Sequence, residues 1–300
     1  MWLGGKDPYT DEVTGTVTRL NLSASYMWEV RSPMLHPRID EGSVVFDGRF
    51  YVFGGYQNTY NKIDMRVLHS VECYSPSSDE WQLLPPMIQP RMNPRGVVEI
   101  CGCFYIVDGV DYSGDSDGGH FSFNPEAALE PYAEKYVPSL QKWVALPERL
   151  GPRPVDFVSV TACNNCLYLI GGMHCDIENY SSLEQLWIDA AVRLTQRYDV
   201  KSNAWELLLP MPQARYWPAA ATLNGKIYVF GGENASGSLT TLECFDPLSG
   251  EWQILSPMPV ALYRGFYVAA LGGSMRMHAC GTVESNGRFA VSCFDTCTRT

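Results

Sequence analysis

The sequence contains no apolar run that approaches the roughly 18 residues needed to cross a bilayer as a helix. Charged residues make up only 18% of the chain, and acids outnumber bases to give a formal net charge of −11. This acidic balance argues against general binding of nucleic acids through their phosphates. No nucleophile elbow, P-loop or dinucleotide fingerprint occurs in a strand–turn–helix context. The signatures of these enzyme classes are therefore missing.

Histidine is scarce, and its spacing does not suggest a metal site. No two histidines form an HxH or HxxxH pair, whereas a copper oxidase needs clustered histidine and tyrosine ligands. His120 and His174 both fall on inserted loops and could approach each other. The 111–117 stretch resembles a calcium loop only faintly, because it lacks the full acid alternation and the terminal glutamate. We expect no catalytic residue, no metal and no cofactor. The histidines are His36, His69, His120, His174 and His278.

Ten cysteines are scattered along the chain. The pairs Cys101/Cys103 and Cys163/Cys166 have spacings seen in metal and redox sites. Both pairs flank turn-forming residues between apolar runs, so neither opens a helix as a thioredoxin motif does. We interpret them as free structural thiols, which favours a reducing compartment and a cytoplasmic location.

A glycine-bearing doublet follows a hydrophobic stretch six times. The first members of successive doublets lie 50, 54, 63, 60 and 49 residues apart, which is the period of a propeller. A unit of this size is one small sheet that is stable only when it is stacked against its neighbours. The doublets are Gly4-Gly5, Gly54-Gly55, Asp108-Gly109, Gly171-Gly172, Gly231-Gly232 and Cys280-Gly281.

Turn-forming pairs precede the doublets and predict two strands in each unit. Asp47-Gly48 and Asn224-Gly225 are strong signals for a two-residue hairpin, since a type I′ turn needs positive φ at both central positions. Cys101-Gly102, Asn164-Asn165 and Gly273-Ser274 stand at the same offset. We call the strands before and after each turn a and b. The innermost strands, a, should begin near Ile39, Gly96, Val155, Pro218 and Gly265.

An aromatic residue and a tryptophan follow at a constant separation of seven residues and predict two more strands, c and d. Turn formers lie between the two members, and a proline-rich segment follows the tryptophan. Each unit should therefore be a four-stranded blade. The pairs are Tyr74 and Trp81, Tyr136 and Trp143, Tyr198 and Trp205, and Phe245 and Trp252.

These motifs together resemble the kelch repeat. Residues 215–259, which read RYWPAAATLNGKIYVFGG through LECFDPLSGEWQILSPMP, match it closely. Asp108 in the third unit and the segment from Met275 to Gly281 in the sixth depart from the pattern. The resemblance implies an all-β, kelch-type β-propeller of about six four-stranded blades. We assign the repeated positions to the fold, with glycines where side chains would crowd the next blade and aromatic rings between sheets. They are Gly54, Gly55, Gly171, Gly172, Gly231, Gly232 and the eight aromatic residues just named.

We expect one propeller domain over residues 1–300. Both ends of the sequence fall inside a repeat, so we expect incomplete first and last blades and a longer gene product. The predicted units are a partial one at 1–34, then 36–87, 91–146, 153–210 and 215–257, and a partial one at 264–300.

Antiparallel strand order places the b–c and d–a loops on one face, which we call the variable-loop face. About twenty extra residues follow Gly109, and a similar length follows Gly172. Long connections in an economical fold are often functional. In the second insertion, helical spacing predicts a short helix over about 182–194. Its Trp187 either packs on the propeller rim or is exposed as an anchor for a partner.

Arginines recur near the d–a loops. Arg38, Arg215 and Arg264 stand sixteen residues before their doublets, and Arg91 and Arg153 lie close to that offset. In related kelch propellers, arginines here can grip acidic peptides, and guanidinium suits bidentate carboxylate recognition. Alternatively, each arginine pairs with a local acid or a backbone carbonyl. Arg95 lies off the repeat offset and is the better individual candidate for binding.

We therefore expect a non-enzymatic protein-interaction module with a protein or acidic peptide as partner, and with neither nucleic acid nor membrane. The units most resemble those of BTB-kelch proteins, which implies substrate recognition for a cullin-RING ubiquitin ligase through a BTB domain outside this sequence. Other kelch proteins bind actin, and a few are enzymes. Actin binding and a metal-dependent oxidase or isomerase activity are thus the alternatives.

Overall fold

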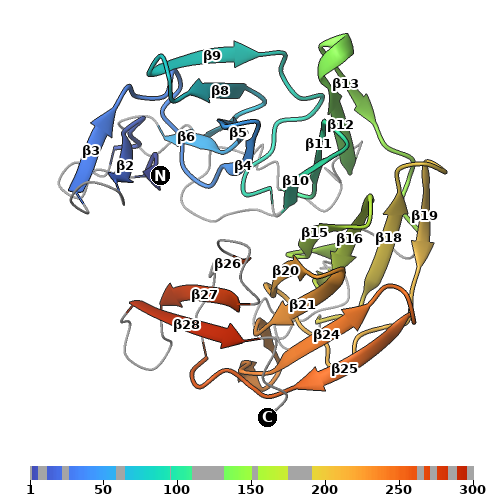
Figure 1. Ribbon diagram of the computed structural model, residues 1–300. Coiled ribbons are helices and arrows are strands. Elements are labelled where there is room, and N and C mark those ends of the chain that lie inside the picture. The colour runs from blue at the N-terminus through green and yellow to red at the C-terminus, as the bar shows by residue number, and fades with distance from the viewer. Residues whose placement is uncertain are drawn as a thin grey trace. The chain divides into compact units, whose positions relative to one another are not determined.

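The computed structural model describes residues 2–5, 12–21, 27–58, 65–94, 96–109, 132–150, 155–174, 191–261, 267–270, 276–282 and 289–295. Apart from one 3-10 turn at Pro138–Leu140, the regular structure in these ranges consists of strands. None of the helical structure in these ranges is long and apolar enough to cross a membrane. The chain divides into two compact units, Met1–Leu146 and Pro147–Thr300 (Figure 1).

The first unit contains three antiparallel sheets, one for each of the first three repeats. The first has the order β1-β2-β3, the second β4-β5-β8-β9 and the third β10-β11-β12-β13. A small ribbon of β6 and β7 extends the b–c connection of the second sheet. The strands are β1 (Trp2–Leu3), β2 (Val17–Asn21), β3 (Met27–Arg31), β4 (Gly42–Phe46), β5 (Arg49–Phe53), β6 (Tyr56–Asn58), β7 (Met65–Val67), β8 (Val71–Ser75), β9 (Glu80–Leu84), β10 (Gly96–Ile100), β11 (Cys103–Val107), β12 (Ala133–Val137) and β13 (Lys142–Ala145).

The second unit also contains three such sheets, with orders β15-β16-β18-β19, β20-β21-β24-β25 and β26-β27-β28. Two short ribbons, β14-β17 and β22-β23, accompany the first two of them. The strands are β14 (Val155–Asp156), β15 (Ser159–Cys163), β16 (Cys166–Ile170), β17 (Met173–His174), β18 (Thr195–Asp199), β19 (Ala204–Leu207), β20 (Ala219–Leu223), β21 (Lys226–Phe230), β22 (Glu233–Asn234), β23 (Gly237–Ser238), β24 (Leu242–Asp246), β25 (Glu251–Leu255), β26 (Tyr267–Ala270), β27 (Arg276–Thr282) and β28 (Phe289–Asp295).

The predicted order of strands a to d is confirmed in four repeats, because each of their sheets runs in sequence order from an inner to an outer strand. The first and last repeats have three strands each in the described residues. The predicted hairpin turns are also present at the four described sites. Both central residues have positive φ in Asp47-Gly48, Cys101-Gly102, Asn164-Asn165 and Asn224-Gly225.

The innermost strands begin within four residues of the predicted positions, at Gly42, Gly96, Ser159, Ala219 and Tyr267. The largest differences between the predicted and the observed first residues of these strands have a common cause. Ile39 forms a bridge with Tyr56, and Val155 pairs with His174 in the β14-β17 ribbon. In both repeats the chain therefore pairs first with the b–c connection, turns through a residue with positive φ, and only then enters the inner strand.

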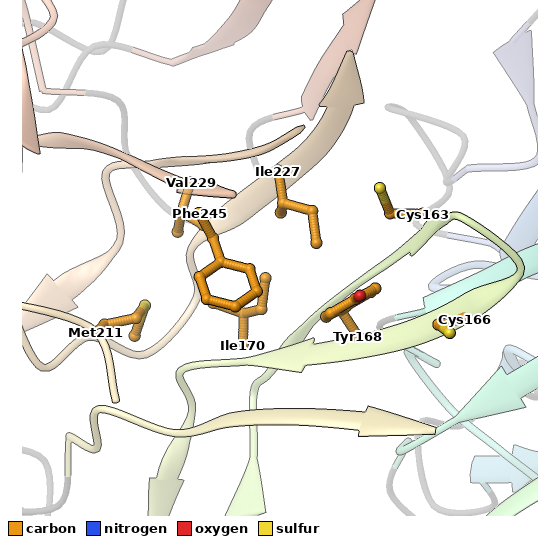
Figure 2. Close-up of a cluster of buried hydrophobic side chains, with 8 residues drawn as sticks. All are labelled: Cys163, Cys166, Tyr168, Ile170, Met211, Ile227, Val229 and Phe245. Atoms are coloured by element: carbon orange, nitrogen blue, oxygen red, sulfur yellow. The ribbon is translucent and has the colours of Figure 1, made fainter. Parts of the chain in front are cut away.

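Aromatic and aliphatic side chains fill the space between neighbouring sheets. In the second unit, Tyr168 and Ile170 from β16 meet Ile227, Val229 and Phe245 of the next sheet, and all five are nearly or fully buried (Figure 2). Cys163, Cys166 and Met211 complete this cluster. An equivalent cluster in the first unit joins β5 and β8 to β11 and β12. Such burial supplies most of the stabilisation of a stacked sheet.

Each repeat tryptophan makes a ring contact within its own sheet and a hydrogen bond to an earlier segment of the same unit. It lies directly across from its strand-c aromatic residue, with ring centroids 5.0–5.4 Å apart. Its indole N–H also donates a hydrogen bond to a carbonyl earlier in its unit, which for Trp81, Trp143 and Trp252 lies just after the outer strand of the preceding sheet. The bonds run from Trp81 to Ser32, Trp143 to Pro85, Trp205 to Pro147 and Trp252 to Leu209, with lengths of 2.8–2.9 Å.

The first glycine of a doublet both adopts positive φ and approaches the next repeat closely. Gly54 has a φ of +62°, and a Cβ atom built there would lie 2.2 Å from the carbonyl oxygen of Arg91. The neighbouring Gly55 N–H donates to that same oxygen at 2.8 Å. Any side chain at Gly54 would therefore push two sheets apart.

We expect Gly54→Ala to lower the free energy of unfolding at least twice as much as Gly48→Ala. Gly48 has a similar φ of +68°, but a Cβ atom there meets nothing within 4 Å. The control should therefore show only the left-handed penalty of about 1–2 kcal/mol. Urea unfolding of both variants checks this, and equal losses would show that the close approach to Arg91 is unimportant.

Candidate functional site

The predicted arginines Arg38, Arg91 and Arg215 occupy equivalent places, and each holds its own sheet together. Each guanidinium donates to the carbonyl of the doublet's first residue, at 2.8 Å to Gly54, 2.8 Å to Asp108 and 2.7 Å to Gly231. The same nitrogen donates to a second carbonyl just before strand c. The arginine thereby closes the b–c connection of its repeat.

A buried glutamate completes each arrangement, which we call the arginine–glutamate clasp. Arg91 Nε donates to Glu134 Oε1 at 2.9 Å, and Arg215 Nη2 lies 2.8 Å from Glu243 Oε1. Arg38 pairs with Glu72 in the same way. The six side chains are at most 1% exposed.

Two of the clasp glutamates also accept hydrogen bonds from the backbone of the d–a loop. Glu72 accepts from the N–H groups of Leu35 and His36, at 2.8 and 3.0 Å. Glu134 accepts from Ile88 at 2.7 Å and Gln89 at 3.4 Å. Buried charges are tolerated when they are paired and hydrogen-bonded, and the clasps of Arg38 and Arg91 meet both conditions.

Burial and pairing act on these charges in opposite directions. Burial lowers the pKa of Arg38 and of Arg215, and attraction to the paired glutamate partly offsets this in each. Burial likewise raises the pKa of Glu243, against the opposing effect of Arg215. In the third clasp, Arg215 and Glu243 therefore each favour the charged form of the other.

The expectation that these arginines bind a partner is wrong for Arg38, Arg91 and Arg215, because their side chains are 0% exposed. The alternative of pairing with a local acid and backbone carbonyls describes all three. Three other predicted arginines, Arg95, Arg153 and Arg264, lie outside the described residues, as does Trp187.

The helix predicted over 182–194 is wrong at its C-terminal end. Ala191 forms an antiparallel bridge with Met173, and no helix covers the next three residues. The Val192 N–H donates to the Gly172 carbonyl, and the Arg215 N–H donates to the Val192 carbonyl. The backbone of this segment is thus engaged with the doublet and with the next repeat, which a helix would prevent. The remainder of the predicted helix, 182–190, is outside the described residues.

Sequence reasoning missed the glutamates of the clasps, although a signal was present. Glu72, Glu134 and Glu243 each stand two residues before the strand-c aromatic. A recurring acid in the middle of a buried strand indicates a buried partner. The fourth repeat has Gln196 at this position, which is also 0% exposed and donates to the Leu150 carbonyl. That repeat therefore lacks the clasp carboxylate.

A recess of about 630 Å³ lies beside β8 and β9 in the first unit, where Leu35, Arg49 and Trp81 line part of its wall. Its Asp79 carboxylate accepts from the Tyr74 hydroxyl at 2.5 Å and from the Ser32 N–H at 3.1 Å. The hydrogen bond from Tyr74 is the main cause that lowers the pKa of Asp79 below its usual range. The hydrogen bonds of this carboxylate therefore stabilise the contact between adjacent sheets.

The paired cysteines lie on hairpins, as predicted. Cys163 and Cys166 are cross-strand neighbours at the end of β15 and the start of β16, whereas Cys101 lies within the equivalent turn and Cys103 begins β11. All four are free thiols, and burial raises the pKa of Cys103, Cys163 and Cys166. Among the residues that the structure describes, no three His, Cys, Asp or Glu side chains gather as metal ligands would.

Comparison with known proteins agrees with this architecture. The model of the KLHDC2/KLHL20/DRC7 Kelch-repeats domain matches residues 42–258. Beta-scruin of Limulus polyphemus is 25% identical over 78% of this chain and 23% of its own length. Human Kelch-like protein 23 is 25% identical over 71% of this chain and 32% of its own length. Mouse Kelch-like protein 35 is 28% identical over 52% and 31%.

The chain thus spans about a quarter to a third of the length of these relatives. A solved structure titled "Structure of YjhT" aligns with a TM-score of 0.68 at 17% identity, covering 97% of this chain and 92% of that one. At this identity the likeness concerns the fold alone. The doublets, the paired aromatic residues and the match to the family model agree, and the chain belongs to the kelch-repeat family, with a kelch-type β-propeller fold.

Proposed function

We propose that this chain is the substrate-recognition propeller of a cullin-RING ubiquitin ligase adaptor in the cytoplasm. What carries the proposal is family membership together with the relatives named Kelch-like proteins, of which the chain covers about a third. The remaining two thirds of such a protein would supply the ligase contact, while the propeller supplies the choice of partner without catalysing a reaction.

We place the partner on the variable-loop face. The two longest connections in the sequence are b–c connections, one in each unit, between β11 and β12 and between β17 and β18. The corresponding turns on the opposite face contain only two residues. Variation in length at one face of a constant scaffold is typical of a recognition surface.

Arg95 is the contact residue that we propose on this face in the first unit. It directly precedes β10 in the sequence, whereas the nearby Arg91 is buried and paired with Glu134 in its clasp. A guanidinium here would recognise a carboxylate of the partner, although the chain as a whole is acidic, because local potential governs such encounters. Arg153, Arg264 and Trp187 are further candidates on the same face.

The test begins with partners cross-linked to the full-length gene product in cells and verified with the purified chain. Arg95→Ala should weaken the binding of a verified partner by about 1–3 kcal/mol, the range for a charge-assisted hydrogen bond. Asp47→Asn and Lys226→Ala, on the opposite face, are matched controls and should not change affinity. Loss of binding in a control variant, with Arg95→Ala unaffected, would show that the face is wrongly chosen.

A role as a ligase adaptor predicts two further results. The full-length product should co-precipitate a cullin, and deletion of this chain should lengthen the partner's half-life. Actin binding is the alternative that the family resemblance leaves open. Co-sedimentation of the chain with filamentous actin, without any cullin association, would favour it over the adaptor role.

A further inference from the structure

One backbone position recurs before the inner strand of four repeats and has positive φ. In the first unit, Asp40 and Asn93 occupy it, with φ of 54° and 52°. In the second unit, Phe157 and Trp217 occupy it, with φ of 59° and 51°. Asp and Asn enter this region readily, whereas bulky aromatic residues there are genuine outliers. Strained residues of this kind cluster at ligand sites.

The two strained aromatic residues contact each other. The Trp217 backbone N–H donates to the Phe157 carbonyl at 3.0 Å, and their ring centroids are 4.9 Å apart at an interplanar angle of 68°. Tyr216 contacts Trp217 from its own side, with centroids 5.2 Å apart at 70°. Phe157 and Trp217 remain partly exposed. The strain therefore presents the rings of Phe157 and Trp217 at the surface, while Tyr216 beside them is buried.

A carboxylate lies beside this group. Tyr216 and Glu233 exchange backbone hydrogen bonds of 2.9 and 2.8 Å, and the Tyr216 hydroxyl donates to Glu233 Oε2 at 3.3 Å. Glu233 is only 8% exposed. It directly follows Gly232, and Phe157 and Trp217 come just before inner strands, so all belong to the variable-loop face.

We propose that Phe157, Tyr216, Trp217 and Glu233 form a subsite for a cationic side chain, arginine or lysine, of a partner protein. We call it the aromatic subsite, and it rests on the proposed interaction function. Aromatic faces attract cations through their quadrupole, most strongly for tryptophan. The Glu233 carboxylate and the net charge of −11 add attraction of the same sign.

The experiment uses the purified 300-residue chain and four labelled Gly-Ser peptides with arginine, lysine, norleucine or glutamate at the centre. Affinity is measured at physiological salt, and the part of the tryptophan fluorescence change that is lost in Trp217→Asn reports contact with Trp217, because the chain has eight tryptophans. We expect the arginine and lysine peptides to bind more tightly than the other two. Trp217→Asn should reduce this binding roughly tenfold, in line with a desolvated cation–π contact.

Further variants separate recognition from folding. Asparagine suits positive φ, so the melting temperature of Trp217→Asn should change little while binding falls. Trp217→Phe keeps a ring and should retain part of the affinity. Glu233→Gln keeps the shape and should reduce both the affinity and its salt dependence. Lys226→Ala, on the opposite face, should not alter binding.

Three results would overturn the subsite: equal binding of the norleucine peptide, preference for the glutamate peptide, or unchanged binding in Trp217→Asn. A verified protein partner that binds Trp217→Asn normally would also overturn it, and would leave the interaction function intact. Binding of the cationic peptides without any protein partner in cells would instead count against the proposed function alone.

Discussion

Glu134→Ala is expected to lower the free energy of unfolding by about 3–5 kcal/mol, the range for breaking a buried ion pair. The substitution leaves the Arg91 guanidinium buried without its counter-charge, and it removes the acceptor of the Ile88 and Gln89 N–H groups. The loss should appear in urea unfolding, and amide hydrogens of β12 and of the Ile88 segment should exchange sooner.

The exposed pair Arg197–Glu206 provides the control, with a separation of 2.5 Å and side chains 30% and 55% exposed. Glu206→Ala should change stability by less than about 1 kcal/mol. Glu134→Gln should give a loss smaller than that of Glu134→Ala, because an amide keeps the shape and one acceptor. Similar small effects in Glu134→Ala and Glu206→Ala would show that the clasp is not a main support of the fold.

Trp143→Ala is expected to cost about 3–5 kcal/mol, as large aromatic truncations in a core do. Its ring contacts Phe53 and Tyr136, with centroids 6.1 and 5.4 Å away, and its side chain is 5% exposed. The substitution opens a cavity between two sheets of the first unit and leaves the Pro85 carbonyl without its indole donor. Calorimetry or urea unfolding measures the loss.

Trp28 provides the matched control. It lies across from Leu20 in β2 as Trp143 lies across from Tyr136, yet it is 59% exposed. Trp28→Ala should therefore cost less than about 1 kcal/mol. Trp143→Phe keeps much of the ring volume but loses the indole N–H, so it should fall between the two. A loss in Trp28→Ala as large as that in Trp143→Ala would contradict this account of the tryptophan position.

The strand framework could be read from the sequence because its signals are local. A two-residue turn such as Asn224-Gly225 determines the register of its hairpin, and the seven-residue separation of Phe245 and Trp252 places them opposite each other. Glycine doublets at a constant place in the repeat predict where adjacent sheets approach. Each of these features depends on neighbouring residues, so tertiary structure was not needed to recognise it.

The role of the arginines depended on tertiary structure. The sixteen-residue offset of Arg38 and Arg215 suits a ligand contact and a buried pair equally well. The glutamate that decides between them lies 34 residues beyond Arg38 but 28 beyond Arg215, so no constant spacing reveals the pair. Only the folded sheet shows that both guanidiniums face inward.

The sequence by itself therefore determined the kelch repeat, its strands and the place of the long connections between strands b and c. The tertiary structure alone decided which polar and aromatic side chains are buried and which remain exposed. It buries Arg91 against Glu134, and it places Phe157 against Trp217 across sixty residues of sequence. The physical reason is that turn and strand preferences act within a few residues, whereas burial and charge pairing depend on segments that meet only in the folded chain.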